Sequence, residues 1–251
     1  MTTGWNEQVA LVTGASSGLG AQFARTLAAK GVAVVLAARR VDRLAALEAE
    51  IVAAGGRALA VELDVTDVDA FDAVLDRVEK AIGPVTILIN NAGQNIMAKA
   101  ADFSPSQYDE LMSLNLRAPF FLATACAKRW IAKGIKGRII NISSGSAYRT
   151  VPMITPYAVS KAALNHLTAC LAREWAKFEI AVNGLAPGYV RTEINDWLWD
   201  TPNGQKLLDA FPRRRVGEPS DLDATLLLLA DPSQRFITGQ TIVVDDGQVL
   251  A

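Results

Sequence analysis

Cysteine and histidine are scarce in this chain. Its 251 residues include two cysteines, Cys126 and Cys170, and a single histidine, His166. Neither cysteine belongs to a Cys-x-x-Cys pair, and one histidine is too few to complete the four-ligand sites that zinc prefers. The sequence therefore predicts no metal centre.

Long apolar runs and an excess of charge of one sign are also missing. The longest uninterrupted apolar run, residues 32–38, is far shorter than the ~20 residues of a membrane-spanning helix. The N-terminus has no basic stretch followed by an apolar one. Lys plus Arg (25) against Asp plus Glu (26) gives a net charge of −1, so no overall positive field attracts nucleic acid or acidic lipid. We expect a soluble, cytoplasmic protein that binds neither nucleic acid nor a membrane.

Short apolar runs rich in β-branched residues alternate with longer segments of helical periodicity. This alternation is typical of βαβ units and a parallel sheet, and the continuous apolarity of residues 32–36 indicates strands buried on both faces. We predict one α/β domain over residues 1–251, a doubly wound, Rossmann-type fold with a seven-stranded parallel sheet and helices on both faces. The expected strands span residues 9–13, 33–38, 58–63, 86–90, 138–142, 181–185 and 241–244.

Residues 191–219 break this alternation. Pro202, Gly204 and Pro212 interrupt the segment, which shows no strand pattern. Large apolar residues are frequent in it, namely Ile194, Trp197, Leu198, Trp199 and Phe211. Because long irregular insertions in compact domains are usually functional, we expect a substrate lid here.

A glycine-rich turn follows the first expected strand. Residues 13–20 read Thr-Gly-Ala-Ser-Ser-Gly-Leu-Gly and lead into a helical segment that runs to Lys30. Glycines let the backbone approach a pyrophosphate, and the free N–H groups at a helix start attract it. We therefore predict contacts to a dinucleotide from Gly14, Ser16, Ser17, Gly18, Leu19 and Gly20.

The same turn also matches the Gly-x-Ser-x-Gly elbow of a hydrolase, which would make Ser16 a nucleophile. This alternative has His166 as its only possible base. It also lacks a preceding strand and loop to supply an oxyanion hole. The sequence therefore favours the phosphate-binding interpretation.

The second expected strand ends in Ala37-Ala38-Arg39-Arg40, where a dinucleotide-binding protein often presents an acid to the adenosine ribose. No carboxylate is present, whereas a guanidinium grips a 2′-phosphate with its planar fork. We choose Arg39 for this contact and interpret Arg40 and Arg43 as the solvated start of the next helix. The preferred cofactor is therefore NADP(H) rather than NAD.

Together with further motifs in a fixed order, these features resemble the short-chain dehydrogenase/reductase family over nearly the whole chain. The motifs are Thr13-Gly14-x-x-x-Gly18-x-Gly20, Asp64-Val65, Asn90-Asn91-Ala92-Gly93, Asn115, Ser144, Tyr157-x-x-x-Lys161 and Pro187-Gly188-x-x-x-Thr192. The resemblance implies an oxidoreductase that transfers a hydride between the nicotinamide of NADP(H) and a carbonyl or secondary alcohol.

Tyr157 and Lys161 stand one helical turn apart, on one face of an expected helix. Reduction of a carbonyl places negative charge on its oxygen, which needs a proton donor beside it. An ammonium close to the phenol is expected to lower the pKa of Tyr157. The resemblance makes Tyr157 the general acid/base, assigns Lys161 a further contact to the nicotinamide ribose, and gives Ser144 the substrate oxygen. It gives Asn115 a proton relay through water, and a helix kink or cap is the alternative for this residue.

The resemblance also implies cofactor contacts for residues that follow other strands. Asp64 and Val65 would meet the adenine, and Asn91 and Gly93 the adenosine side. Pro187, Gly188, Val190 and Thr192 would line the cofactor beyond the sixth strand, with Val190 and Thr192 at the carboxamide. One departure stands near the C-terminus, where Val244-Asp245-Asp246-Gly247 has an aspartate in place of a glycine of the family's frequent Val-Asp-Gly-Gly. It puts the path and packing of the tail in doubt.

The expected pocket wall is mostly apolar and suits a medium-sized ketone or secondary alcohol. Its residues are Gln94, Ile96, Met97, Ser146, Tyr148, Met153, Tyr189, Trp197 and Trp199. The two tryptophans have packing or a subunit contact as an alternative. The triplet Arg213–Arg215 is interpreted as a solvated or ion-paired cluster.

Two expected helices, residues 116–131 and 158–177, carry apolar residues around much of their circumference. A subunit interface would use the excess, and the resemblance suggests a homotetramer or homodimer. A cofactor-binding regulator without turnover is an alternative to an enzyme. The complete set of Asn115, Ser144, Tyr157 and Lys161 argues against it.

Overall fold

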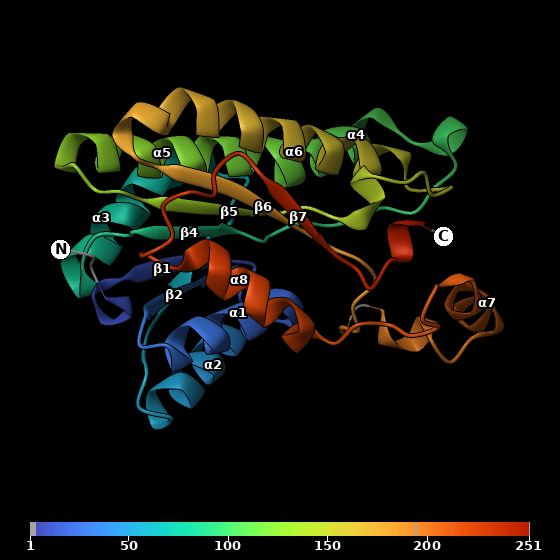
Figure 1. The fold of residues 1–251 in the computed structure, drawn as a ribbon, viewed down its shortest axis with the longest axis horizontal. Coiled ribbons are helices and arrows are strands. Elements are labelled where there is room, and N and C mark those ends of the chain that lie inside the picture. The colour runs from blue at the N-terminus through green and yellow to red at the C-terminus, as the bar shows by residue number, and fades with distance from the viewer. Residues whose placement is uncertain (1–3, 194, 251) are drawn as a thin grey trace.

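Seven parallel strands form a single sheet in the order β3-β2-β1-β4-β5-β6-β7 (Figure 1). The computed structural model describes residues 4–193 and 195–250. The strands are β1 (Val9–Thr13), β2 (Ala33–Ala38), β3 (Arg57–Glu62), β4 (Ile87–Asn90), β5 (Arg138–Ile142), β6 (Ala181–Pro187) and β7 (Thr241–Val244). The doubly wound, seven-stranded parallel sheet expected from the sequence is confirmed, with strand ends shifted by at most two residues.

Helices cover both faces of the sheet. They are α1 (Gly18–Ala29), α2 (Val41–Ala53), α3 (Phe71–Ile82), α4 (Pro105–Met112), α5 (Ala118–Lys133), α6 (Thr155–Trp175), α7 (Pro202–Ala210) and α8 (Asp223–Ala230). Figure 1 shows α3, α5 and α6 on one face and α1, α2 and α8 on the other. Alternate residues of β1 feed the two cores, with Val9 and Leu11 in one and Ala10 and Val12 in the other. Such two-sided burial explains the uninterrupted apolar strands.

The strand order reverses between β1 and β4. Connections leave these two strands in opposite directions, which opens a crevice at their carboxyl ends. The turns after β1, β4, β5 and β6 all begin at this edge of the sheet. The fold thereby brings together loops that lie far apart in the sequence.

The segment predicted to be an irregular lid contains a helix. In α7, Pro202 occupies the first turn, and the Thr201 side chain accepts a hydrogen bond from the Gly204 N–H. Proline is favoured at a helix start, so Pro202 begins a helix where we interpreted it as an interruption. Ile194, which we counted among the apolar residues of this segment, lies outside the described residues. Among the described residues, no helix combines the length and apolar character that crossing a membrane requires.

Candidate active site

The turn between β1 and α1 has the tight backbone expected of a phosphate cradle. Gly14 adopts a φ of +66°, a conformation that glycine reaches without strain. A side chain at Gly20 would place its Cβ 2.4 Å from the Gly14 carbonyl oxygen and 2.6 Å from Asn91 Nδ2. Only glycine fits at these positions, and the start of α1 is left facing the crevice.

Arg40, rather than Arg39, contacts this turn. Arg40 Nη2 donates to Ser16 Oγ at 2.9 Å and to Ser17 Oγ at 2.6 Å. Arg39 is largely exposed and lies 3.7 Å from Asp64 Oδ2. Arg43, expected to be solvated, pairs with Glu193 at 2.7 Å. Two guanidinium groups, those of Arg39 and Arg40, therefore stand at the end of β2, beside Asp64 and the turn after β1 respectively.

Asp64 and Val65 follow β3 at the same end. Asp64 Oδ1 accepts hydrogen bonds from Thr66 N at 2.9 Å and Thr66 Oγ1 at 2.8 Å. The backbone N–H of Thr66 is the main reason why the pKa of Asp64 is lowered, and Arg39 adds to it. Val65 is buried. Asp64 thus holds its own turn and pairs with Arg39, within a cluster that includes the residue chosen for the 2′-phosphate.

The loop after β4 connects the phosphate turn with the reactive side chains. Asn91 Nδ2 donates to the Thr13 carbonyl at 2.8 Å, which fastens this loop to β1. A Cβ on Gly93 would lie 3.2 Å from Asn115 Oδ1 and 3.4 Å from Lys161 Nζ. Asn91, Gly93, Asn115 and Lys161 are therefore neighbours.

Asn115 lies at the centre of a π-helical turn, Ser113–Arg117, that joins α4 to α5. Its side chain is fully buried. Asn115 Oδ1 accepts from Gln94 N at 3.0 Å, and Nδ2 donates to Gln94 O at 2.9 Å and Ser160 Oγ at 3.1 Å. The amide thus fixes the loop after β4 against α6, which agrees with the helix-kink alternative. π-Helical turns are frequent at functional sites.

A line of buried polar contacts fastens α6 to β5. Asn141 Nδ2 donates to Thr168 Oγ1 at 2.9 Å, and Ser143 Oγ donates to the Lys161 carbonyl at 3.2 Å. Between them, Lys161 Nζ donates to the Ile142 carbonyl at 2.8 Å. We call these contacts the β5–α6 seam. It sets the height of α6 along the strand, and with it the positions of Tyr157 and Lys161.

Loss of hydration raises the pKa of Tyr157, and the neighbouring Ser144 side chain offsets only part of this effect. Burial also lowers the pKa of Lys161 to about 8. The expected lowering of the phenol's pKa by Lys161 is not found, because the ammonium points at the Ile142 carbonyl and lies 5.8 Å from the centre of the Tyr157 ring.

The residues after β6 contact both the end of β7 and the phosphate turn. Gly188 N donates to the Val244 carbonyl at 3.1 Å, beyond the buried end of β6 at Pro187. Val190 forms a bridge with Gly217. A Cβ on Gly18 would meet the Thr192 methyl group at 3.5 Å. Residues 191–217 therefore begin at the phosphate turn and return to the same place.

The expected pocket residues have different surroundings. Trp199 is 1 % exposed and packs edge-to-face on Tyr189, so the packing alternative describes it, whereas Trp197 is 66 % exposed. The Tyr148 side chain hydrogen-bonds to Thr241 on β7. Met97 and Met153 are both exposed, and their loops are joined by a hydrogen bond from Ala98 N to the Met153 carbonyl at 3.0 Å.

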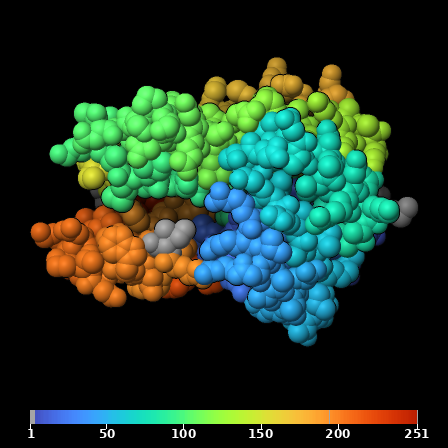
Figure 2. All heavy atoms as spheres, turned by 180° about the vertical axis from the view of Figure 1, so that it is seen from behind, coloured from blue at the N-terminus to red at the C-terminus, as the bar shows by residue number. Residues whose placement is uncertain are grey.

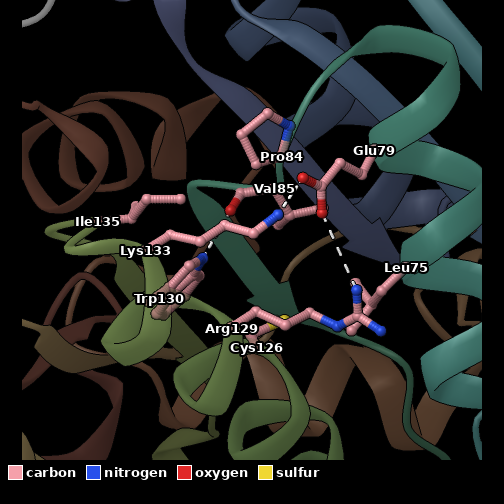
Figure 3. Close-up of a pocket in the computed structure, with 9 residues that line it drawn as sticks. All are labelled: Leu75, Glu79, Pro84, Val85, Cys126, Arg129, Trp130, Lys133 and Ile135. Atoms are coloured by element: carbon pink, nitrogen blue, oxygen red, sulfur yellow. Dashed lines mark hydrogen bonds and ion pairs between the residues drawn. The ribbon is translucent and has the colours of Figure 1, made fainter.

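Figure 2 shows the surface hollowed between the segment that contains α4 and the segment that contains α7, with the α2 segment beside one end of the hollow. A separate small pocket lies between α3 and α5 (Figure 3). Arg129 and Lys133 of α5 both pair with Glu79 of α3 there. These ion pairs join two helices on the outside of the sheet, so we interpret the pocket as a packing feature.

The sequence profile of the short chain dehydrogenases matches residues 8–203. The chain belongs to the short-chain dehydrogenase family. As a member of this family it is an oxidoreductase, which removes the hydrolase alternative for Ser16. Two observations agree with this: Ser16 Oγ accepts hydrogen bonds from Arg40, and His166 is exposed on α6, across the sheet from α1 (Figure 1).

Individual relatives of this dehydrogenase match almost end to end. Gluconate 5-dehydrogenase of Gluconobacter oxydans is 38% identical over 239 residues, which are 95% of this chain and 93% of the relative. The A-factor type gamma-butyrolactone 1′-reductase (1S-forming) of Streptomyces virginiae is 38% identical over 248 residues, 96% and 95% of the two chains. The crystal structure of a gluconate 5-dehydrogenase from Burkholderia cenocepacia in complex with NADP and tartrate has a TM-score of 0.92 and 36% identity, and covers 98% and 96%.

Proposed function

We propose that this dehydrogenase interconverts a ketone and a secondary alcohol with NADP(H), and that Tyr157 is its general acid/base. The observation that supports this most directly is the proximity of Tyr157 to Ser144, which is near enough to lower the phenol's pKa, and to the buried Lys161, whose Nζ lies 5.8 Å from the centre of the Tyr157 ring. These groups stand at the edge of the sheet where the phosphate turn begins. NADPH supplies the hydride when it is bound.

The residues of the crevice suit a dinucleotide. A Cβ at Gly20 would collide with the backbone of Gly14, so the absence of a side chain leaves the start of α1 open to a pyrophosphate. The further cofactor contacts that we propose come from Ser16, Ser17, Gly18, Leu19, Asp64, Val65, Asn91, Gly93, Pro187, Gly188, Val190 and Thr192, together with Tyr157 and Lys161.

Preference for NADP(H) over NAD(H) is proposed from the charges at the end of β2. Arg39 and Arg40 lie there, and the carboxylate of Asp64, which follows β3, is paired with Arg39. Arg40 is already oriented by Ser16 and Ser17, which reduces the conformational entropy lost when it binds a 2′-phosphate. The NADP in the Burkholderia cenocepacia relative supports the same choice.

Tyr157 is a phenol at neutral pH, because burial raises its pKa, and a phenol is the form that can donate a proton to a developing alkoxide. Ser144 lies where it can hold the same oxygen. Lys161 and Asn115 are proposed to return the proton from solvent through water.

The substrate is proposed to be a ketone with an apolar group next to the carbonyl. Met97 and Trp197 are each 66 % exposed, on the chain segments that lead into α4 and α7, and Met153 holds a φ of +68°, which is unusual for a long side chain. Exposed apolar side chains at a pocket mouth suit an apolar ligand better than a sugar acid. In this respect the proposed substrate resembles that of the butyrolactone reductase more than gluconate.

The test is a panel of medium-sized ketones assayed with NADPH and with NADH. We expect NADPH to be used preferentially, and Tyr157→Phe to lower kcat by at least about a hundredfold. Tyr108→Phe is the matched control, since it removes an exposed phenol on α4 that has no part in the proposed site, and its kcat should stay near that of the wild type. Undiminished turnover in Tyr157→Phe would remove the proposed acid, and equal use of NADH would remove the proposed role of the arginines.

A homodimer or homotetramer is proposed from the outer faces of α5 and α6. Phe120, Phe121, Ile131 and Val159 are exposed on these helices. Apolar clusters of this kind mark contacts between protein chains. Light scattering of the purified protein should give a mass of two or four chains, and a monomer would contradict the proposal. A cytoplasmic location stays a prediction.

A further inference from the structure

Two features of the sequence have no part in the proposed hydride transfer, and the structure brings them together. They are the arginine triplet 213–215 and Asp246, where the family resemblance leads to an expectation of glycine. Arg215 Nε donates to Asp246 Oδ2 at 2.7 Å, and Arg213 Nε lies 3.3 Å from Asp246 Oδ1. One carboxylate therefore pairs with two guanidinium groups.

The backbone on both sides is shaped for this pairing. Arg214 has a φ of +48°, and at this turn its two neighbours reach the same carboxylate. Asp246 has a φ of +55°, a left-handed conformation that costs most side chains energy and that aspartate tolerates better than others. The hydrogen bond from Arg215 is the main reason why the pKa of Asp246 is lowered. Its carboxylate is thus charged and held at neutral pH.

The turn that carries Asp246 contacts Tyr189 after β6, the C-terminal end of the expected lid and the loop after β5. We call residues 245–250 the C-terminal turn. Gln248 is buried, its Oε1 accepts from Tyr189 N at 2.6 Å, and its Nε2 donates to the Arg215 carbonyl at 3.4 Å. Its own carbonyl accepts from Arg149 Nη1 at 2.7 Å. A shift of this turn would therefore also displace Tyr189 and the loop that contains Ser144.

The far end of the lid segment packs on the same turn. A Cβ on Gly247 would meet Pro212 Cγ at 3.6 Å, and a Cβ on Gly145 would meet Val249 Cγ1 at 3.1 Å. The C-terminal turn thus lies between Pro212 of the lid segment and Gly145 beside the reactive serine. Figure 1 shows it next to the segment that contains α7.

We propose that Asp246 is a positioning residue of the substrate pocket. Its ion pairs with Arg213 and Arg215 hold the far end of the lid segment, residues 191–219, on the C-terminal turn and so limit how far the lid opens. The inference rests on the proposed function only for its effect on substrate. Asp246 is about a fifth exposed and both arginines are largely exposed, so these pairs are weak enough to break and re-form.

The first test follows hydrogen–deuterium exchange of residues 201–217 in the full chain without substrate. Asp246→Asn keeps the size of the side chain and its tolerance of the left-handed backbone but removes the charge. We expect about threefold faster exchange in this segment. Glu50→Gln is the matched control, because it removes the same charge from the Arg25–Glu50 pair on α1 and α2, and the lid segment should exchange as in the wild type.

A second pair of variants removes the partners instead. Arg213→Gln with Arg215→Gln should accelerate the lid segment as much as Asp246→Asn, and combining all three changes should add nothing further, because one interaction is lost in each case. Additive effects, or lid exchange equal to that of the Glu50→Gln control, would overturn the proposal. The arginine variants keep the test decisive even where Asp246→Asn folds poorly.

Turnover separates this inference from the proposed function. With a ketone that the wild type reduces, Asp246→Asn should raise KM for the ketone about threefold and leave kcat and KM for NADPH unchanged. A fall in kcat with unchanged KM would overturn the positioning role. Faster lid exchange in a protein that reduces no ketone would refute the proposed function and leave the ion-pair tether itself supported.

Discussion

The β5–α6 seam and the lid segment are held in opposite ways. In the seam, Asn141, Lys161 and Thr168 are buried, and each makes a hydrogen bond to its neighbour across the two elements. In the lid segment the ties to the rest of the chain include exposed ion pairs, Arg43 with Glu193 and Arg213 with Asp246. Buried hydrogen bonds resist opening because the groups would be left unpaired, whereas exposed pairs exchange readily with water and salt.

The difference separates two requirements of the proposed reaction. The proton donor and its neighbours must keep fixed distances to the reacting atoms, which a rigid seam provides. The substrate must enter and leave, which a loosely tied lid permits. In this reading, substrate preference can change through the lid and the loop around Met97 without disturbing Tyr157 and Lys161.

The strongest way to challenge the seam is to remove its buried charge. Lys161 has a pKa of about 8 in the folded protein against an ordinary value of 10.5, so between these two values the unfolded chain holds more protons and stability rises with pH. Between pH 7 and pH 10.5, we expect the free energy of unfolding of the wild type to rise by about 3 kcal/mol more than that of Lys161→Met. The comparison does not depend on activity, which we expect the variant to lack. Urea unfolding across this range measures the difference.

The control for this experiment is Lys30→Met, which removes an exposed lysine at the end of α1. Its unfolding free energy should run parallel to that of the wild type over the same range. If the unfolding free energy of Lys161→Met also ran parallel to that of the wild type across this pH range, burial of the ammonium in the seam would carry no electrostatic cost.

A smaller effect is expected from Thr168→Val, which keeps the shape of the side chain but removes its oxygen. Thr168 is fully buried, and its loss leaves Asn141 Nδ2 without its partner, at a cost of about 2 kcal/mol in the free energy of unfolding. Thr124→Val is matched, since Thr124 Oγ1 donates the same bond to the carbonyl four residues earlier, at a less buried position on α5. Equal losses of unfolding free energy in the two variants would mean that the hydrogen bonds of the seam contribute no more to stability than one nearer the surface.

Much of the fold could be predicted because strands that are buried on both faces appear in this sequence as continuous apolar runs. β1 and β2 are buried on both faces, so their apolar runs end where the strands end. The glycine-rich turn could also be predicted, because a side chain at Gly14 or Gly20 would collide with neighbouring atoms. No local pattern in the sequence indicates that Asn115, Gly93 and Lys161 are neighbours.

Other features depend on contacts that no spacing in the sequence announces. Arg40 turns to Ser16 and Ser17 although it is adjacent to the equally plausible Arg39. Lys161 points to the Ile142 carbonyl, which contributes no side-chain signal at all. The start of α7 was available from the sequence, as Thr201 followed by Pro202 is a good helix beginning, but three breakers in one segment concealed it.

The smallest predicted effect compares the two regions in a single sample. Raising NaCl to 0.5 M shortens the screening length well below its value in dilute buffer, so the exposed pairs of Asp246 and Glu193 should weaken. We expect exchange in residues 201–217 to rise about twofold while exchange in α6 is unchanged, because the seam contains no solvent-exposed ion pair among the contacts that define it.

The same titration in Asp246→Asn should show a reduced salt response in the lid segment. An equal response of α6 and the lid segment in the wild type would mean that salt acts on the whole fold, and the contrast between a fixed catalytic side and an ionically tied substrate side would be lost.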